Sequence, residues 1–307
     1  MRAVNDYPIV SVVIPTFNRG AAISRSVESA ANQDWPNIEI IIVDDHSTDD
    51  TWQYIQTIKS PRVRAVRHEV NGGGGRARNT GIDEAKGDFI AFLDSDDYWS
   101  PDKISRQMEV STSRGDKTVV YNRISMVIGA RNERVPKYAW DEKIPIEEYL
   151  VIHEQSMQTS GLLLHKNFAK SVRFDDDLRK HQDIDFVLSL NLHGGKFVFC
   201  PADTVFYENS SLQNRVSTNP KPELTQILLN KWVGKITHRT VCYYKAVNIA
   251  PMQARRSLSR SFATLASTLP HSLPFAKRII EGYIFWNLSE TSYNNFRSLY
   301  RTILRKR

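Results

Sequence analysis

Three carboxylates crowd into four positions directly after an apolar segment of the chain. Asp94, Asp96 and Asp97 follow residues 89–93 (FIAFL), a run that predicts a buried strand. Like charges this close repel one another, and a solvated turn does not need three of them. Paired carboxylates suit a hard cation such as Mg²⁺ or Mn²⁺, which binds through one or two carboxylates together with substrate phosphates. A solvated acidic turn that caps the next helix is the alternative.

A second acidic pair, Asp44 and Asp45, ends the β-branched run 38–43 (IEIIIV). A carboxylate at the end of a strand can accept a hydrogen bond from a nucleobase N–H or a ribose hydroxyl. An Asx-type turn explains the pair equally well when it is considered alone. Residues 15–19 (PTFNR) hold the same position after the apolar run 9–14 (IVSVVI).

A glycine-rich stretch at residues 71–75 (NGGGG) precedes Arg76 and Arg78. Such a loop can bind phosphate through backbone N–H groups with arginine charge behind them, or it can be a mobile surface loop. The stretch matches neither a Walker loop nor GxGxxG, so it is a weak signal by itself.

The segment Gln182-Asp183-Ile184-Asp185 contains a candidate general base. Asp183 and Asp185 are two positions apart and do not share a helix face, so at most one of them faces a given ligand. Acidic residues in a first helical turn also complement the helix dipole, which is the structural alternative. We interpret His181 as a neighbour of this group and not as a ligand.

The elements that must position these residues alternate between strand and helix, which predicts a doubly wound, mainly parallel α/β sheet. Ligands of such sheets bind beyond the carboxyl ends of the strands, where the polar groups above are expected to converge. We expect strands at 9–14, 38–43, 62–67, 89–93, 118–121, 125–128, 161–165 and 196–200. We expect helices at 20–33, 50–59, 77–85, 101–111, 146–152 and 179–192.

The composition is that of a soluble globular protein, with 41% hydrophobic and 24% charged residues among 307. Two cysteines without a CxxC pair argue against a disulfide scaffold and fit a reducing, cytoplasmic compartment. The N-terminus lacks the basic lead of a signal peptide, and no apolar window is long enough to predict a transmembrane helix.

Charge divides the chain into an acidic front and a basic rear. Residues 221–307 hold 15 Lys and Arg against three Asp and Glu, a net +12, and residues 1–220 carry −5. The rear also has apolar stripes, with Leu258, Phe262 and Leu265 on one helical face and a second stripe at residues 296–304. Such basic amphipathic helices lie on anionic membranes, so we expect peripheral contact at the inner face of the cell membrane through residues 250–307. Packing on the front of the chain or in an oligomer is the alternative.

Four motifs in order closely resemble family 2 glycosyltransferases of the GT-A fold. They are VVIPTFNR at 12–19, IVDDHSTD at 42–49, GRARNTG at 75–81 and FLDSDD at 92–97. The similarity covers about residues 8–110 and extends more loosely to about 205. It implies a GT-A catalytic domain at residues 1–218 that binds nucleotide-sugar and acceptor, and a basic helical extension at 219–307.

The resemblance also implies roles for individual residues. Pro15, Thr16 and Asn18 would line the nucleotide, Asp44 would hold the base, usually uracil, and Arg78 would approach the diphosphate or the sugar. Asp94 would lie near the ribose or donor sugar, Asp96 would ligate Mn²⁺ or Mg²⁺, and Asp183 would be the catalytic base. The chain departs from the family pattern at Gln182, where a glutamate usually precedes the base.

The implied activity is an inverting transfer from a UDP-sugar to a glycan or lipid-linked acceptor, in surface polysaccharide or glycolipid synthesis. A nucleotidyltransferase is an alternative, but it would want a glycine-rich basic loop where this chain has Pro-Thr-Phe-Asn. Gln182 keeps open a non-catalytic sugar-nucleotide-binding subunit. Nucleic acid is not expected as a partner, because the front is acidic and no nucleic-acid-binding motif is present.

Overall fold

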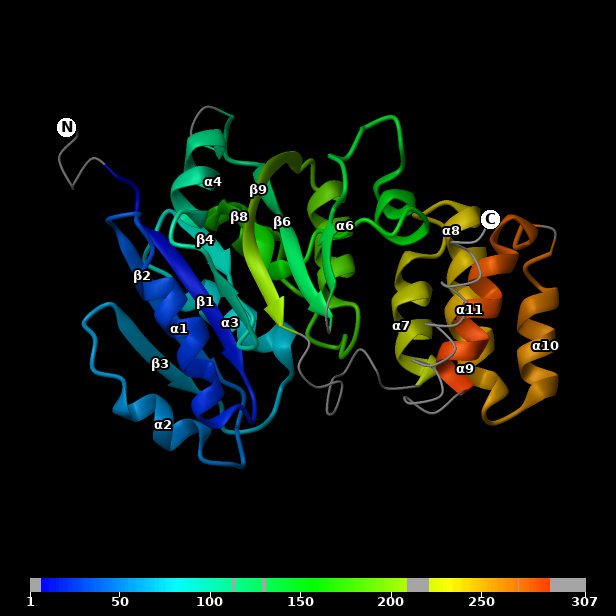
Figure 1. The fold of residues 1–307 in the computed structure, drawn as a ribbon, viewed down its shortest axis with the longest axis horizontal. Helices are drawn as coiled ribbons and strands as arrows, with labels where there is room; N and C mark the ends of the chain where they lie inside the picture. The colour runs from blue at the N-terminus through cyan, green and yellow to red at the C-terminus, as the bar shows by residue number, and fades with distance from the viewer. Residues whose placement is uncertain (1–6, 112–113, 129–130, 209–220, 270, 288–307) are drawn as a thin grey trace. The chain divides into compact units, whose positions relative to one another are not determined.

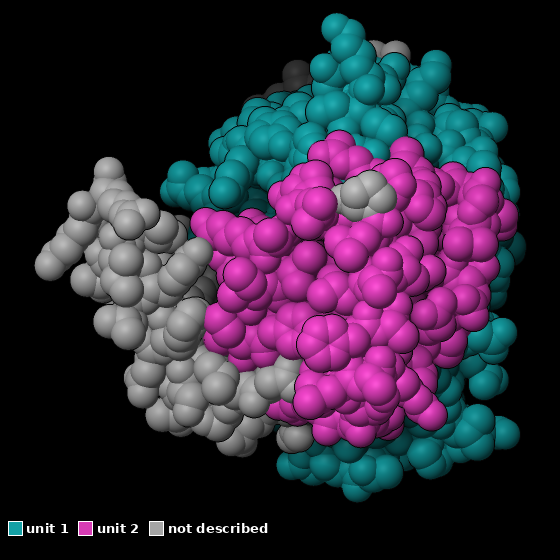
Figure 2. All heavy atoms as spheres, turned by 90° about the vertical axis from the view of Figure 1, so that its right-hand side faces the viewer, with its two compact units in different colours: residues 1–214 teal, residues 215–307 magenta. Residues whose placement is uncertain are grey.

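The computed structural model describes residues 7–111, 114–128, 131–208, 221–269 and 271–287, which are traced in colour in Figure 1. The chain forms two compact units, residues 1–214 and residues 215–307, which Figure 2 shows in different colours. The expected boundary at residue 218 lies outside the described residues.

The first unit is built on a nine-stranded sheet of mixed, mostly parallel pairing, in the order β3-β2-β1-β4-β8-β6-β9-β5, with β7 paired to β6. Its parallel half consists of β1 (Val10–Thr16), β2 (Ile38–Asp44), β3 (Val63–Arg67) and β4 (Phe89–Phe92). Every residue of β1 is buried, as expected for a β-branched strand between two neighbours in a parallel sheet. The remaining strands are β5 (Asp97–Trp99), β6 (Thr118–Ile128), β7 (Arg131–Val135), β8 (Leu162–His165) and β9 (Lys196–Glu208).

Helices cover both faces of the parallel half, because successive side chains of β1 point to opposite sides. Val12 and Ile14 belong to one core cluster with Ile23 of α1, whereas Val13 lies against Gly81 of α3. The prediction of a doubly wound sheet is therefore confirmed. The helices of this unit are α1 (Ile23–Ala31), α2 (Thr51–Thr57), α3 (Gly74–Glu84), α4 (Lys103–Ser111), α5 (Lys166–Val172) and α6 (Gln182–Leu192).

Some elements differ from the sequence predictions. Residues 118–128 form one long strand where two short ones were expected, and β9 continues to Glu208 beyond the predicted end at residue 200. The strands β5 and β7 were not predicted. The glycines at 74 and 75 belong to helix α3 and not to a flexible loop.

The second unit is helical, which confirms the predicted helical extension. It contains α7 (Pro222–Trp232), α8 (His238–Tyr243), α9 (Ala250–Ala254), α10 (Leu258–Ala266) and α11 (Ala276–Asn287). The predicted stripe at 296–304 lies outside the described residues. No helix within the described residues has both the length and the apolar character needed to cross a bilayer.

Candidate functional site

The polar groups at the ends of β1, β2 and β4 meet at one edge of the sheet. Thr16 stands opposite Asp44 in the β1–β2 register, and the N–H of Asp45 donates to the carbonyl of Thr16 at 2.9 Å. On the other side of β1, Val13 accepts from the N–H of Leu93, which places Asp94 beside the same edge. The structure therefore brings together the candidates from these three segments.

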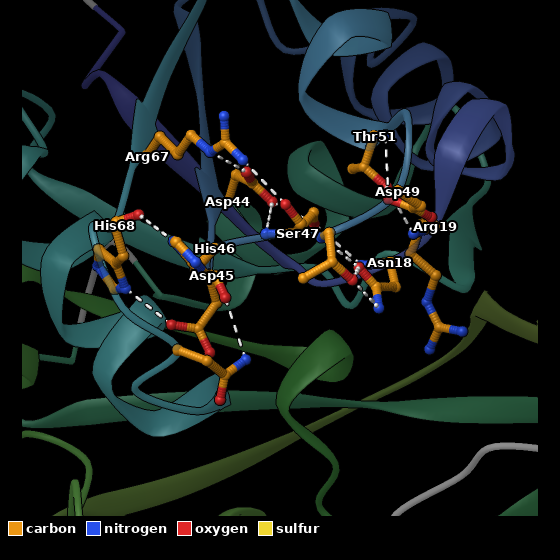
Figure 3. A network of polar contacts seen from close by, with 12 residues as sticks. Asn18, Arg19, Asp44, Asp45, His46, Ser47, Asp49, Thr51, Arg67 and His68 are labelled. Carbon is orange, nitrogen blue, oxygen red and sulfur yellow. Dashed lines mark hydrogen bonds and ion pairs between the residues drawn. The ribbon is translucent and has the colours of Figure 1, made fainter.

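Hydrogen bonds join the loop after β1 to the loop after β2 (Figure 3). Asn18 has a left-handed backbone (φ 51°), and its side-chain Oδ1 accepts from the N–H of Thr48 at 2.8 Å. The hydroxyl of Thr51 accepts from the N–H groups of Arg19 and Gly20 at 2.8 and 2.7 Å. The Asn18 side chain thus ties the loop after β1 to the loop after β2.

Asp44 is fully buried at the end of β2 and makes contacts with both of its carboxylate oxygens (Figure 3). Oδ1 accepts a short hydrogen bond from the hydroxyl of Ser47. Oδ2 lies 3.2 Å from Nε of Arg67, an ion-pair contact without hydrogen-bond geometry. Among the described residues, this buried oxygen has no hydrogen-bond donor. Thr16 presents a second buried oxygen, Oγ1, for which the described residues provide no hydrogen-bond partner.

Asp45 has a different task from Asp44, because its carboxylate anchors the glycine-rich stretch. It accepts from the N–H groups of Gly72 and Gly73 at 2.8 and 2.6 Å and contacts Nδ1 of His68 at 2.8 Å. These two N–H groups are engaged within the protein, so the suggestion that they bind phosphate is not supported. The same contacts argue against a mobile loop.

Arg78 connects the end of β4 to the start of α6. Its Nη2 lies 2.5 Å from Oδ1 of Asp94, and its Nη1 donates to Oε1 of Gln182 at 3.0 Å. The guanidinium also lies over the ring of Phe174, 5.4 Å from its centroid. Arg78 is buried, so a rigid cation stands between two segments that lie far apart in the sequence.

Asp183 lies in the first turn of α6, next to this arginine. Burial raises the pKa of the Asp183 carboxyl, and the charge of Asp94 raises it further. The backbone N–H of Ile184 and the charge of Arg78 oppose this increase in pKa without cancelling it. Part of the side chain remains accessible to solvent although protein atoms surround it. A partly accessible carboxylate with a raised pKa is a suitable general base.

His181 precedes this turn with a left-handed backbone (φ 62°). Burial and the neighbouring charge of Lys180 lower the pKa of His181 to about 3, which keeps its imidazole neutral near pH 7. This agrees with its interpretation as a neighbour of the base.

The acidic turn after β4 separates into different roles. Asp97 is buried, and its carboxylate accepts from the hydroxyl of Ser160 at 2.5 Å, so it holds β5 in place and does not face a ligand. Asp96 stays partly exposed and forms an ion pair with Arg19, with Nη2 and Oδ2 2.9 Å apart. Only Asp94 and Asp96 therefore remain as candidates for ligand contacts.

Asp94 and Asp96 are the described side chains of this site that could bind a divalent cation. Within the described ranges, no three His, Cys, Asp or Glu side chains are grouped to hold a metal ion. Asp94 and Asp96 nevertheless offer partly exposed carboxylate oxygens, the donors that Mg²⁺ and Mn²⁺ prefer. A cation at Asp96 would complete its shell with water and diphosphate oxygens, as Mg²⁺ commonly does.

Two contributors to the site were not singled out from the sequence as candidates. Arg19 is the last residue of the motif VVIPTFNR at 12–19, and its position directly after Asn18 is the sequence signal that could have identified it. Ser160 comes from the segment before β8 and donates to Asp97 while its Oγ also accepts from the N–H of Asp94 at 3.0 Å. Its place in the sequence carries no pattern that would have identified it.

Comparison with known proteins gives a consistent result. Residues 11–162 match the profile described as Glycosyl transferase family 2. The amylovoran biosynthesis glycosyltransferase AmsB of Erwinia amylovora is 29% identical over 270 residues, which cover 82% of this chain and 89% of AmsB. An uncharacterized glycosyltransferase of Haemophilus influenzae is 30% identical over 59% of this chain and 71% of its own length.

A third relative is more similar over a shorter segment. The Escherichia coli enzyme WfaP, named as a UDP-Glc:alpha-D-GlcNAc-diphosphoundecaprenol beta-1,3-glucosyltransferase, is 49% identical over 100 residues, or 33% of this chain and 40% of WfaP. Among solved structures, S. aureus TarS in complex with UDP-GlcNAc superposes with a TM-score of 0.58 at 19% identity, over 90% of this chain and 80% of the TarS chain. The structural similarity confirms the predicted GT-A fold.

Proposed function

The chain belongs to glycosyltransferase family 2, and from that premise we propose that it transfers a sugar from a UDP-sugar to a hydroxyl of a glycan or lipid-linked acceptor, with inversion. The observation that carries this proposal is the position of Asp183 beside Arg78 and Asp94, with Asp44 at the carboxyl end of the same parallel sheet. These residues support the proposal because they could supply a base, a cation for the diphosphate and a polar edge for the nucleotide.

The residues support a division of work along the crevice. Asp44 Oδ2, which has no hydrogen-bond donor among the described residues, is the acceptor that we assign to the imide N–H of uracil, which reaches this buried atom once the Arg67 side chain moves. Pro15, Thr16 and Asn18 form the adjoining edge. Arg78 suits the diphosphate or the sugar because it is charged, rigid and held at one end of the crevice. Asp94 orients Arg78 and lies where it can also accept from a ribose or sugar hydroxyl.

Asp183 is the group that we assign to the chemical step. As the acceptor oxygen attacks the anomeric carbon, the carboxylate of Asp183 takes its proton, and the bond to the nucleoside diphosphate breaks with its electron pair. Attack from the face opposite the leaving group inverts the anomeric configuration. Mn²⁺ or Mg²⁺ bound at Asp96 would offset the negative charge that develops on the departing diphosphate.

A place in surface polysaccharide synthesis is supported by the names of the relatives. AmsB is named for amylovoran biosynthesis, and the acceptor in the name of WfaP is a diphosphoundecaprenol-linked sugar. The donor is further supported by the UDP-Glc in the name of WfaP and the UDP-GlcNAc in the TarS structure.

The proposal is tested by replacing the base. We expect Asp183→Asn to lower transfer of label from UDP-sugars to polyprenyl-diphosphate-sugar acceptors by about 10² or more, because general base catalysis contributes that much. Affinity for UDP should stay nearly unchanged, since the proton transfer is absent from nucleotide binding. The measurement pairs a label-transfer assay with calorimetric titration of UDP, and Asp177→Asn, at an exposed position, is the matched control. Equal loss of UDP affinity and of rate would show that Asp183 is not the base.

A further inference from the structure

Helix α10 turns polar side chains toward its own unit and exposes apolar ones. Two hydroxyls of this helix face the second unit's own core. Ser261 is buried, and its Oγ donates to the carbonyl of Ala250 at 2.7 Å. Thr264 Oγ1 donates to Oε1 of Gln253 at 2.7 Å. Two apolar side chains face outward, with Leu258 64% and Phe262 68% exposed, whereas Leu265 of the predicted stripe is half-buried.

This arrangement is the reverse of what water alone favours. An amphipathic helix on a soluble surface buries its apolar stripe and leaves its polar face to the solvent. Here the hydroxyls are fixed by specific hydrogen bonds, so the orientation of α10 is determined and cannot be reversed without leaving them unpaired. The exposed stripe is therefore suited to an apolar environment outside the unit.

The apolar surface continues beyond the helix. Leu269 lies in the turn after the helix and is also exposed, as is Leu273 at the start of the next short helical segment (Leu273–Phe275). Single exposed apolar residues need no explanation, but this segment exposes four large ones within sixteen residues, and we refer to these four as the patch.

Basic residues accompany the patch. Arg255 and Arg260 are exposed on either side of Leu258, and Lys277 and Arg278 are exposed at the start of α11. Residues 221–307 carry a net charge of +12. A helix with an outward apolar stripe and flanking arginines has the composition of an element that lies in a bilayer interface.

We propose that α10 and the turn after it dock on the surface of an anionic phospholipid bilayer, with Leu258, Phe262, Leu269 and Leu273 inserted between the headgroups. Charge favours lipid over a second copy as the occupant of this surface. A second copy of this unit carries the same +12 and would repel it. An anionic leaflet instead attracts each arginine. The proposal is independent of the proposed activity, because it concerns residues outside the crevice.

The test is co-sedimentation of the full chain with vesicles of phosphatidylcholine alone or mixed with phosphatidylglycerol. Wild-type protein should sediment with the mixed vesicles and much less with the neutral ones. The pair Leu258→Ser and Phe262→Ser should weaken partitioning about tenfold or more, because burying each side chain is strongly favourable. Arg260→Gln should weaken it about fivefold at low salt and less at high salt.

A matched control replaces equally exposed apolar residues elsewhere. Leu192, 62% exposed on α6, and Val233, 58% exposed after α7, are changed to serine, and vesicle binding should not change. Thermal unfolding should be similar for all variants, since none of these side chains is buried. Analytical ultracentrifugation of the same proteins measures self-association.

The proposal is overturned if wild-type protein ignores anionic vesicles, or if the paired serine variant binds them as wild type does. A dimer that dissociates in the paired variant, with no vesicle binding by wild type, would assign the patch to a second copy. Failure of vesicle binding would leave label transfer to soluble acceptors intact, so it is distinguishable from failure of the proposed activity.

Discussion

Asp183 stands between two opposing charges, and its protonation depends on their balance. Asp94 raises the pKa of the Asp183 carboxyl and Arg78 lowers it, while burial makes the largest contribution and raises it. Gln182, where the family usually has glutamate, accepts a hydrogen bond from Arg78 without adding a negative charge. The departure at Gln182 therefore leaves more of the arginine's charge to act on Asp94 and Asp183.

This balance predicts how the rate depends on pH. The base acts in its deprotonated form, so transfer should rise with pH through a pKa above that of an ordinary aspartate. Gln182→Glu adds a carboxylate beside Arg78 and should move this rise to higher pH, because a second negative charge disfavours ionisation of Asp183. The profile of kcat/KM against pH measures the shift, with Gln182→Met as the uncharged control. A rise that moves to lower pH would contradict the proposed charge balance.

Arg19 gives a second prediction at this scale. Its guanidinium occupies one oxygen of Asp96, 2.9 Å away, where a cation would otherwise bind. Arg19→Gln should therefore tighten binding of Mn²⁺ in the absence of nucleotide by about two- to fivefold, the range set by a partly exposed ion pair. Calorimetric titration with Mn²⁺ measures this affinity, and the difference should shrink at high salt.

Arg64→Gln is the control for Arg19, because Arg64 forms a partly exposed ion pair at 2.6 Å with Glu84, a carboxylate outside the site. The proposed competition between Arg19 and Mn²⁺ for Asp96 is wrong if Mn²⁺ binding requires Asp96 and yet its affinity is the same in Arg19→Gln as in wild type. Absence of any Mn²⁺ binding, even with UDP, would instead refute the proposed metal site.

The sequence predicted which residue types gather at the crevice but not how they pair. Asp44 and Asp45 are adjacent in the chain, yet Asp44 contacts Ser47 and Arg67 whereas Asp45 accepts from the N–H groups of Gly72 and Gly73. The distinction depends on which way each side chain leaves the end of β2. Neighbours such as Arg67 that come from other strands decide it, and no local pattern reports them.

At the scale of elements, α3 is positioned by close contact with β1. A Cβ built on Gly81 would lie 2.2 Å from Cγ1 of Val13, so only glycine allows the helix to approach the strand this closely. The same helix carries Arg78 into the crevice. The distance between α3 and β1 therefore sets the place of the arginine.

Gly81→Ala should destabilise the protein by about 1–3 kcal/mol, the usual cost of overpacking a core. It should also weaken UDP binding if α3 shifts away from β1 and takes Arg78 with it. Thermal unfolding and UDP titration measure the two effects. At Gly161 an added Cβ would meet its nearest neighbour at an ordinary 3.4 Å, so Gly161→Ala is the control. Equal stability of the two variants would contradict the packing argument.

The elements that the sequence predicted well are those with a strong apolar period. The strands β1, β2 and β4 and the helices between them were predicted within a few residues, because both faces of this sheet half are buried. Strand β5 was missed since it has only three residues and begins on Asp97, whose type favours turns. The start of α3 was missed because Gly74 and Gly75 are poor helix formers that tertiary packing places in a helix.

At the scale of the whole molecule, the front of the chain and the proposed donor carry net charges of the same sign. Residues 1–220 carry a net charge of −5, yet the proposed donor is an anionic diphosphate. Around the proposed donor site, three arginines supply positive charge locally. They are Arg19, Arg67 and Arg78, each paired with a carboxylate. In the proposed complex these arginines would face the diphosphate, and a divalent cation would add positive charge where Asp94 and Asp96 stand.

We propose above all that the residues at the ends of β1, β2 and β4 bind a uridine diphosphate-sugar, through Asp44 and a cation at Asp96. The most direct measurement is a thermal-shift panel of UDP, GDP, dTDP and CMP, each with and without Mn²⁺, on wild type, Asp44→Asn and Asp96→Asn. We predict a shift for wild type with UDP that depends on Mn²⁺, equivalent to about 2.7 kcal/mol at a hundred times the dissociation constant. Asp96→Asn should lose the dependence on Mn²⁺, and Asp44→Asn should lose the preference for UDP. No shift with any nucleotide, or an equal shift with all four, would contradict the account.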